Sequence, residues 1–270
     1  MTPLPPEMMP RGTPGGTADS AGQAWAGRVL RSNPFAGDDG TAPPALAAAL
    51  ALEDETERMR GVTDALREER VLVPVVAHEH PGRDDDGSVA AHTKHGSDDP
   101  QGDACSSAAM VSVRTPDGRA ALPVFSSVEA MAAWDATARP VPVEGARAAL
   151  SAVSDADSMV VLDPAGPVTV LLGRPAVWSI VQRSEWVPSW VDPELPAVAA
   201  AALSGITELL AVRLERGTRS ELRAVLAVAQ DLDRERVADV IARAQQALSE
   251  DPVLRERVDS LELYPMAVVE

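Results

Sequence analysis

Helical and extended patterns alternate along most of this chain, and this alternation limits the folds available to it. Residues 54–69 place Met59 and Leu66 on one helical face, with acids and arginines opposite. They lead directly into the short apolar segment 71–76. Similar helical and apolar segments follow each other to the C-terminus, with hairpins among them. The pattern predicts an α+β fold in which helices cover a mixed sheet.

A hairpin and a helix are predicted in the middle of the chain. Residues 110–113 and 120–125 flank a Thr-Pro-Asp-Gly turn, an arrangement typical of a β-hairpin. Ser126 and Glu129 have the spacing of a capping box, which predicts that a helix begins there. The proline-rich segment 139–143 favours an extended connection.

Composition divides the chain into a tail and two predicted domains. Residues 1–32 contain few large apolar groups, which predicts a disordered tail. Residues 33–190 carry the main α+β pattern, interrupted over 77–107 by a polar stretch that we predict to be a flexible His- and Asp-rich insertion. Residues 191–270 repeat the alternation on a shorter scale. We therefore expect a domain with a mixed sheet and covering helices, followed by a smaller α+β domain.

Charge and cysteine content argue against several classes of function. The chain has 24 basic and 41 acidic side chains, a net charge of −17, and a single lysine, Lys94, so it lacks the basic clusters that bind nucleic acids. Cys105 is the only cysteine, which excludes an intramolecular disulfide and a thiolate zinc cluster. No secretory signal and no run of about eighteen apolar residues are visible. We expect a cytoplasmic protein that binds neither nucleic acid nor membrane.

Common catalytic motifs are missing from the sequence. It contains no G-x-x-x-x-G-K-[ST], G-x-G-x-x-G or G-x-S-x-G segment. Cys105 has no neighbouring glycine or arginine that would favour a thiolate, so an incidental cysteine is the favoured interpretation. Asp155 and Asp157 fall between a predicted helix and strand, where solvated acids are ordinary. The sequence therefore assigns no catalytic residue and predicts no cofactor.

The histidines of the chain gather in the predicted insertion, at positions His78, His80, His92 and His95. Imidazole is a good ligand for zinc, nickel or copper. Useful metal sites are normally held on rigid elements, however, and this segment is predicted to be flexible. A polar loop without a metal is therefore favoured, and the four histidines remain weak candidates.

Tryptophan and arginine side chains gather near residue 190. Trp178, Trp186 and Trp190 lie within thirteen residues of one another. These residue types dominate binding hot spots because they combine large apolar area with directional polar groups. The candidate binding residues are Arg139, Asp163, Arg174, Trp186 and Trp190. The alternative is that Trp186 and Trp190 only attach a linker to both domains, and the helical position of Trp178 predicts a core residue.

Several blocks of sequence, taken together and in order, point to a known family. The blocks are 33–40, 72–76, 117–130, 139–143, 161–167 and 186–188. They resemble the SseB-type (enhanced serine sensitivity) proteins, and residues 191–270 resemble the smaller second domain of longer members. The resemblance carries no catalytic residues over to these positions. The family label alone suggests an enzyme or accessory factor of amino-acid or sulfur metabolism.

The sequence favours a non-catalytic cytoplasmic binding or regulatory module whose partner is a protein or a small ligand. Two alternatives stay open. One is the enzyme or accessory factor of amino-acid or sulfur metabolism, and the other is weak metal binding through the histidine-rich segment.

Overall fold

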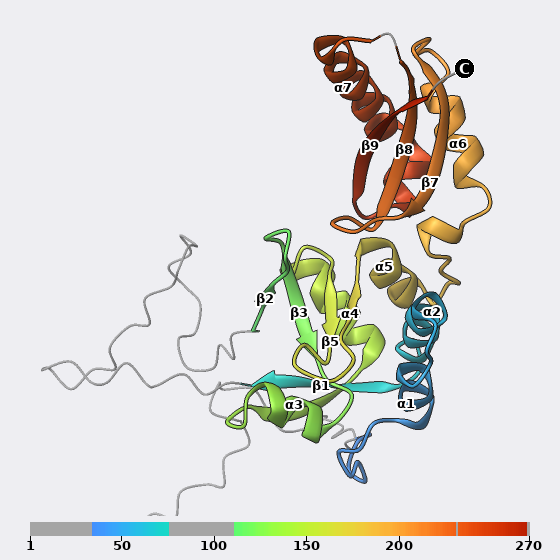
Figure 1. The fold of residues 1–270 in the computed structure, drawn as a ribbon. Helices are drawn as coiled ribbons and strands as arrows, with labels where there is room; N and C mark the ends of the chain where they lie inside the picture. Colours follow the sequence, from blue (N-terminus) through green and yellow to red (C-terminus); the bar gives the residue numbers. More distant parts are fainter. Residues whose placement is uncertain (1–33, 76–110, 231, 269–270) are drawn as a thin grey trace, which may run out of the picture. The chain divides into compact units, whose positions relative to one another are not determined.

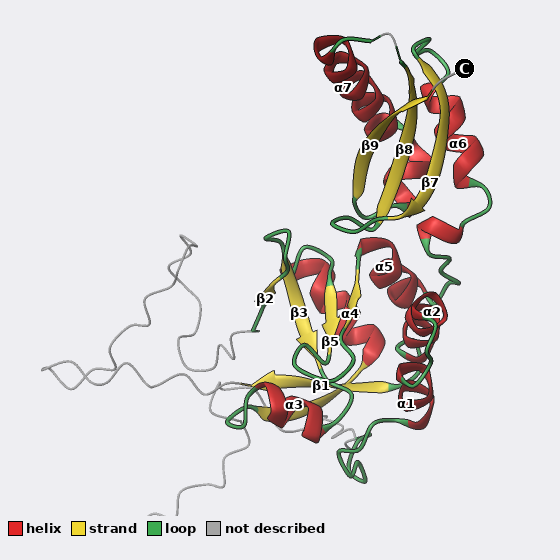
Figure 2. Ribbon diagram, in the orientation of Figure 1, coloured by secondary structure: helices red, strands yellow, loops and turns green. Residues whose placement is uncertain are grey.

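The computed structural model describes residues 34–75, 111–230 and 232–268 (Figure 1). The described residues from Gly40 onward belong to one compact unit. They form helices together with mixed and antiparallel sheets, which confirms the α+β class (Figure 2). The predicted tail over 1–32 and the predicted insertion over 77–107 lie outside the described residues.

The first part of the unit contains six strands in two sheets. They are β1 (Arg70–Val75), β2 (Val113–Arg114), β3 (Ala120–Val124), β4 (Arg139–Glu144), β5 (Val160–Leu162) and β6 (Val170–Leu172). A four-stranded mixed sheet has the order β2-β3-β5-β6, in which only the β3–β5 pair is parallel. The strands β1 and β4 pair antiparallel as a separate sheet. A bridge between Leu72 and Phe125 connects β1 to the end of β3.

Five helices accompany these strands. They are α1 (Pro44–Leu50), α2 (Glu55–Ala65), α3 (Val128–Trp134), α4 (Gly145–Asp155) and α5 (Arg174–Gln182). The Asp54 side chain caps α2 by accepting from the backbone N–H of Glu57, at 2.8 Å. Apolar side chains of α1, α2, α4 and α5 form one buried cluster with β1, β3, β5 and β6. This cluster includes Trp186, which is 7% exposed.

The predicted start of α3 is wrong by one residue. Ser127, and not Ser126, is the N-cap, and its hydroxyl accepts from the backbone N–H of Ala130 at 3.1 Å. The hydroxyl of Ser126 instead donates to the buried carboxylate of Asp163, at 2.7 Å. A long-range partner therefore decides which of two adjacent serines caps the helix.

The segment predicted as an extended connection over 139–143 is a paired strand. It belongs to β4, whose residues lie opposite β1 from Arg139↔Val75 to Glu144↔Arg70. Pro74 and Pro140 occupy facing positions in this pair. Prolines are tolerated in edge strands because they lack only the N–H donor.

The second part of the unit is a three-stranded sheet with helices. Its elements are the short 3-10 helix η2 (Ser189–Val191), α6 (Leu195–Leu203), β7 (Leu209–Arg216), β8 (Leu222–Ala229), α7 (Arg234–Glu250), α8 (Pro252–Arg257) and β9 (Leu261–Val268). β8 is central, antiparallel to β7 and parallel to β9. Alternate β8 residues, from Leu222 to Val228, form a buried cluster with α6, α7 and α8. The Asp233 side chain caps α7 by accepting from the backbone N–H of Arg236 at 2.8 Å.

The two parts have separate buried clusters, and Trp190 packs against both. The boundary predicted near residue 190 stays a prediction, since all described residues from Gly40 onward belong to one compact unit. Among the helices that the structure describes, none combines the length and the apolar character needed to cross a membrane.

Candidate functional site

Two hollows border Trp186, a buried residue between α5 and η2. The larger has a volume of about 780 Å³, and the second has about 740 Å³. Trp186 lines both of them. We call the first the charged cavity and the second the acidic groove, after the side chains described below.

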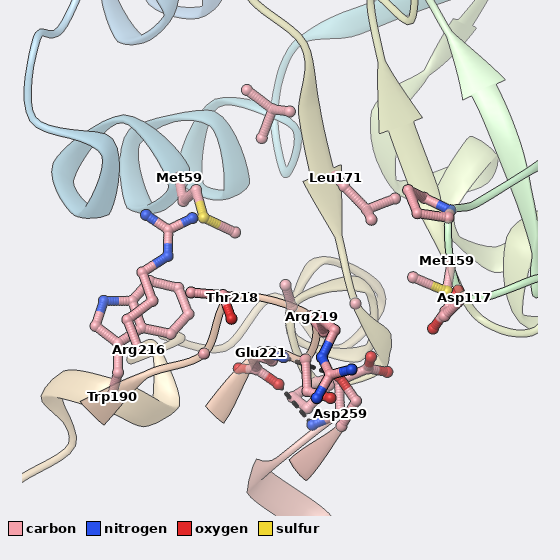
Figure 3. A pocket seen from close by; sticks show the side chains of 18 of the residues that line it. Met59, Asp117, Met159, Leu171, Trp190, Arg216, Thr218, Arg219, Glu221 and Asp259 are labelled. Atoms are coloured by element: carbon pink, nitrogen blue, oxygen red, sulfur yellow. Dashed lines mark hydrogen bonds between the residues drawn. The ribbon is translucent and has the colours of Figure 1, made fainter. Parts of the chain in front are cut away.

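The charged cavity is built from segments far apart in the sequence. α2 contributes Met59, the segment before α5 contributes Gly173, and η2 contributes Trp190. The turn between β7 and β8 adds Thr218, and the residue pair before β9 adds Asp259 (Figure 3). The cavity therefore depends on contacts between the first and second parts of the unit.

A buried ion pair occupies one wall of the charged cavity. The Asp259 carboxylate, with its side chain 4% exposed, accepts two hydrogen bonds from the Arg119 guanidinium, at 3.1 and 2.7 Å. It also accepts from the backbone N–H of Arg174 at the first turn of α5, at 3.0 Å. Asp117 contacts the same guanidinium at 2.7 Å. The hydrogen bond with Asp259 is the main cause of the raised pKa of Arg119, which keeps it fully charged.

Gly173 makes the approach of this carboxylate possible. A Cβ atom at position 173 would lie 2.7 Å from the Cγ atom of Asp259, which is closer than such atoms can pack. Glycine is therefore needed here for a close approach and not for its backbone angles.

A second buried acid, Glu221, lies beside this pair. One of its oxygens accepts from the hydroxyl of Ser189 at 2.8 Å, and the other accepts from the backbone N–H of Asp259 at 2.6 Å. Burial raises the pKa of the Glu221 carboxyl above its ordinary value, against the opposing effect of these hydrogen bonds. Carboxyl groups with a raised pKa often act as general acids or bases in enzymes. Here, both oxygens connect η2 to the segment before β9.

An aromatic and cationic wall closes another side of the charged cavity. The side chain of Arg216 lies beside Trp190 (Figure 3), with its guanidinium 5.0 Å from the ring centre, a cation–π geometry. The same guanidinium pairs with the carboxylate of Glu55. The hydrogen bond from Arg216 is the main reason that the pKa of Glu55 is lowered. The indole N–H of Trp190 donates to the hydroxyl of Thr56 at 3.1 Å. These contacts fix Trp190, which also meets Trp186 edge to face at 6.5 Å.

The acidic groove has a different lining. Trp178 on α5 is 38% exposed, and Val187 is 36% exposed, so an apolar floor faces solvent. Its acids are Glu185, Asp192, Glu194 and Glu256, and its arginines are Arg174 and Arg257. The indole Nε1 of Trp186 is buried and has no hydrogen-bond partner among the residues that the structure describes.

The predicted binding residues divide among three places. Arg174 and Trp186 line the acidic groove, and Trp186 and Trp190 line the charged cavity. Asp163 lines neither; it is buried and accepts from the backbone N–H and hydroxyl of Ser126. Burial raises the pKa of Asp163, in opposition to these two hydrogen bonds. Arg139 is exposed on β4, also outside both hollows.

Trp178 does not lie where it was predicted, and three residues of the charged cavity were not predicted. Trp178 was predicted to be core, but it is partly exposed because α5 presents that face to the acidic groove. Arg119, Glu221 and Asp259 were not singled out. Arg119 and Asp259 are 140 positions apart, and each looks like an ordinary surface charge in its local sequence.

Metal binding has no support among the described residues. Within 34–75, 111–230 and 232–268, no group of three or more His, Cys, Asp or Glu side chains is arranged to hold an ion. The four histidines and Cys105 lie outside these ranges, so their predicted roles stay predictions.

The first part of the unit matches a known family. The family model of the SseB protein N-terminal domain matches residues 44–179. The chain belongs to the SseB family. The SseB match includes Arg119 and most of α5, whereas Trp186, Glu221 and Asp259 follow it. No curated protein and no solved structure matches the chain.

Proposed function

We propose that this SseB-family protein is a non-catalytic cytoplasmic binding or regulatory module that contacts its ligand or partner around Trp186 and Trp190. The observation that carries this proposal is the pairing of the buried acids in the charged cavity. Asp259 is held by Arg119 and the α5 backbone, and Glu221 by Ser189 and a backbone N–H.

This pairing favours binding over catalysis for a physical reason. A general acid or base must exchange a proton with a bound reactant, so at least one of its oxygens must reach that reactant. Both oxygens of Glu221 already accept hydrogen bonds that hold protein segments together. The Asp259 carboxylate is likewise neutralised by a guanidinium that bonds to it twice.

The remaining lining supports a ligand-binding role. A volume of about 780 Å³ lies within the range of pockets for small molecules. Trp190 and Arg216 provide a flat apolar surface and a directional cation, which are features of binding hot spots. The competing enzyme hypothesis is favoured only by the raised pKa of Glu221.

Screening for ligands and for reaction products in the same samples tests the proposal. Metabolite pools would be incubated with the wild-type chain, and bound and free compounds identified by mass spectrometry. We expect at least one compound to be retained unchanged, and retention to fall in Trp190→Ala. Trp134→Ala is the matched control, because Trp134 lines neither hollow. Conversion of any compound that is abolished in Glu221→Gln would overturn the non-catalytic role.

The domain organisation is part of the same proposal. We propose that residues 33–190 form the SseB N-terminal domain with its insertion, and that 191–270 form a smaller SseB-like second domain. Separate buried clusters and separate sheets support this division. Limited proteolysis with mass spectrometry tests it. Stable fragments that end between residues 183 and 194 are expected, and first cuts within β7, β8 or β9 would refute it.

A further inference from the structure

The acidic groove combines an exposed aromatic floor with an excess of negative charge. Trp178 projects from α5, whose neighbouring residues Val177 and Ile180 are fully buried. Trp178 is therefore held on a rigid helix while 38% of it stays exposed. Val187 extends the apolar floor. A rigid, partly exposed indole is well suited to contact a partner side chain.

The two arginines of the groove are already engaged. The guanidinium of Arg174 donates to the carbonyl oxygens of Arg255 and Val258, at 2.6 and 2.8 Å. Arg257 donates to Asp192 at 3.2 Å and to Glu194 at 2.7 Å. Arg257 is thus paired with two carboxylates, whereas Arg174 keeps its positive charge because carbonyl oxygens are neutral. Four acids against two arginines still leave the groove with a net charge of −2.

Two glutamates therefore retain negative charge at the groove. Glu256 is exposed, and no ion pair to it is recorded within the described part of the chain. Glu185 has a side chain that is 77% exposed, and its nearest cation, a nitrogen of Arg60, is 3.8 Å away. Carboxylates beside an indole suit a guanidinium, because its planar fork bonds carboxylates and its face stacks on aromatic rings.

The exposed apolar floor favours an arginine-containing peptide over a small polyamine. A guanidinium bonds carboxylates through its planar fork and stacks on an indole face, whereas each protonated amine of a polyamine is a compact point charge. Trp178 and Val187 therefore favour an arginine-containing segment as the occupant.

We propose that the acidic groove docks an arginine-containing segment of a protein partner, with a guanidinium on Trp178 between Glu185 and Glu256. The proposal rests on the binding role proposed above and names the chemical class of the partner.

Titration of a fluorescein-labelled hexa-arginine peptide, followed by fluorescence anisotropy at low ionic strength, tests the proposal on the full chain. The double variant Glu185→Gln/Glu256→Gln removes two negative charges from the groove, and it is expected to raise the Kd for the peptide about threefold to tenfold. Trp178→Ala is expected to raise it about threefold through loss of the cation–π contact. Circular dichroism confirms that each variant is folded.

The control separates docking from general attraction to an acidic protein. Glu129→Gln/Glu235→Gln removes the same number of charges from exposed helix positions outside both hollows. We expect this double variant to change the Kd less than twofold. Equal weakening by both double variants, or no weakening by either, would overturn the proposal.

Competition with spermidine tests whether the groove prefers a peptide to a polyamine. Spermidine at the same positive-charge concentration is expected to leave most of the labelled peptide bound, whereas unlabelled hexa-arginine displaces it. Equal displacement by spermidine would overturn the peptide assignment. These results would exclude an arginine-containing partner but would leave the proposed binding role standing. The binding role is contradicted only by a different result, the turnover of a compound.

Discussion

Replacing Asp259 with alanine removes the carboxylate that joins Arg119 to the first turn of α5. Two hydrogen bonds from a guanidinium and one from a backbone N–H are lost. A hydrogen bond to a charged group contributes about 1.5–3 kcal/mol, and breaking a fully buried ion pair costs about 3–5 kcal/mol. Arg119 is 31% exposed and keeps Asp117 as a partner, which lowers the cost. We therefore expect Asp259→Ala to lower the free energy of unfolding by about 3 kcal/mol.

Urea unfolding, followed by circular dichroism, measures the free energy of unfolding of the wild type, Asp259→Ala, Arg119→Ala and the double variant that carries both changes. Since the two side chains contact each other, the cycle is expected to give a coupling energy of about 1–2 kcal/mol. Asp155→Ala is the control, because the structure records no side-chain partner for this exposed aspartate, and it should change stability by less than about 0.5 kcal/mol. A coupling energy near zero, or equal effects of Asp259→Ala and Asp155→Ala, would show that the Arg119–Asp259 pair does not stabilise the fold.

Three further predictions concern the neighbouring structure. Glu221 has a raised pKa in the folded chain, so it binds more protons there than when unfolded. Stability is therefore lost as pH rises through that pKa. Thermal unfolding over a pH series should show a smaller loss in Glu221→Gln than in the wild type, and the remaining loss comes from Asp163, whose pKa is also raised. Ser127→Ala should lower the free energy of unfolding by about 1 kcal/mol, because α3 loses its cap. Ser126→Ala should lower it by about 2 kcal/mol, because the buried carboxylate of Asp163 loses its hydroxyl donor. Equal losses in urea unfolding would contradict these two roles. Gly173→Ala should cost about 1–3 kcal/mol by crowding Asp259, and additive losses in the double variant with Asp259→Ala would argue against that contact.

Local patterns predicted the elements whose stability is largely local. The hairpin around residues 115–118 was predicted, because its turn residues occupy consecutive positions. The capping residue of α3 was missed by one position because Ser126 and Ser127 are equally suitable in sequence. Their roles are separated only by the distant carboxylate of Asp163.

The candidate site was less predictable because it is assembled over long distances. The tryptophan-rich segment was found from composition, and it does border both hollows. Its charged neighbours were not found, since the pairing of Arg119 with Asp259 and of Ser189 with Glu221 depends on the tertiary structure. The exposure of Trp178 likewise depends on which face of α5 the other elements leave open.

The indole N–H signals of the tryptophans, followed in an NMR titration with hexa-arginine, report where the peptide binds. We predict that the signals of Trp178 and Trp186 shift together and saturate, because both residues line the acidic groove. Trp134, which lines neither hollow, should keep its position. Saturating shifts at Trp134 with none at Trp178 and Trp186 would contradict the claim that this protein binds its partner at the groove beside Trp186.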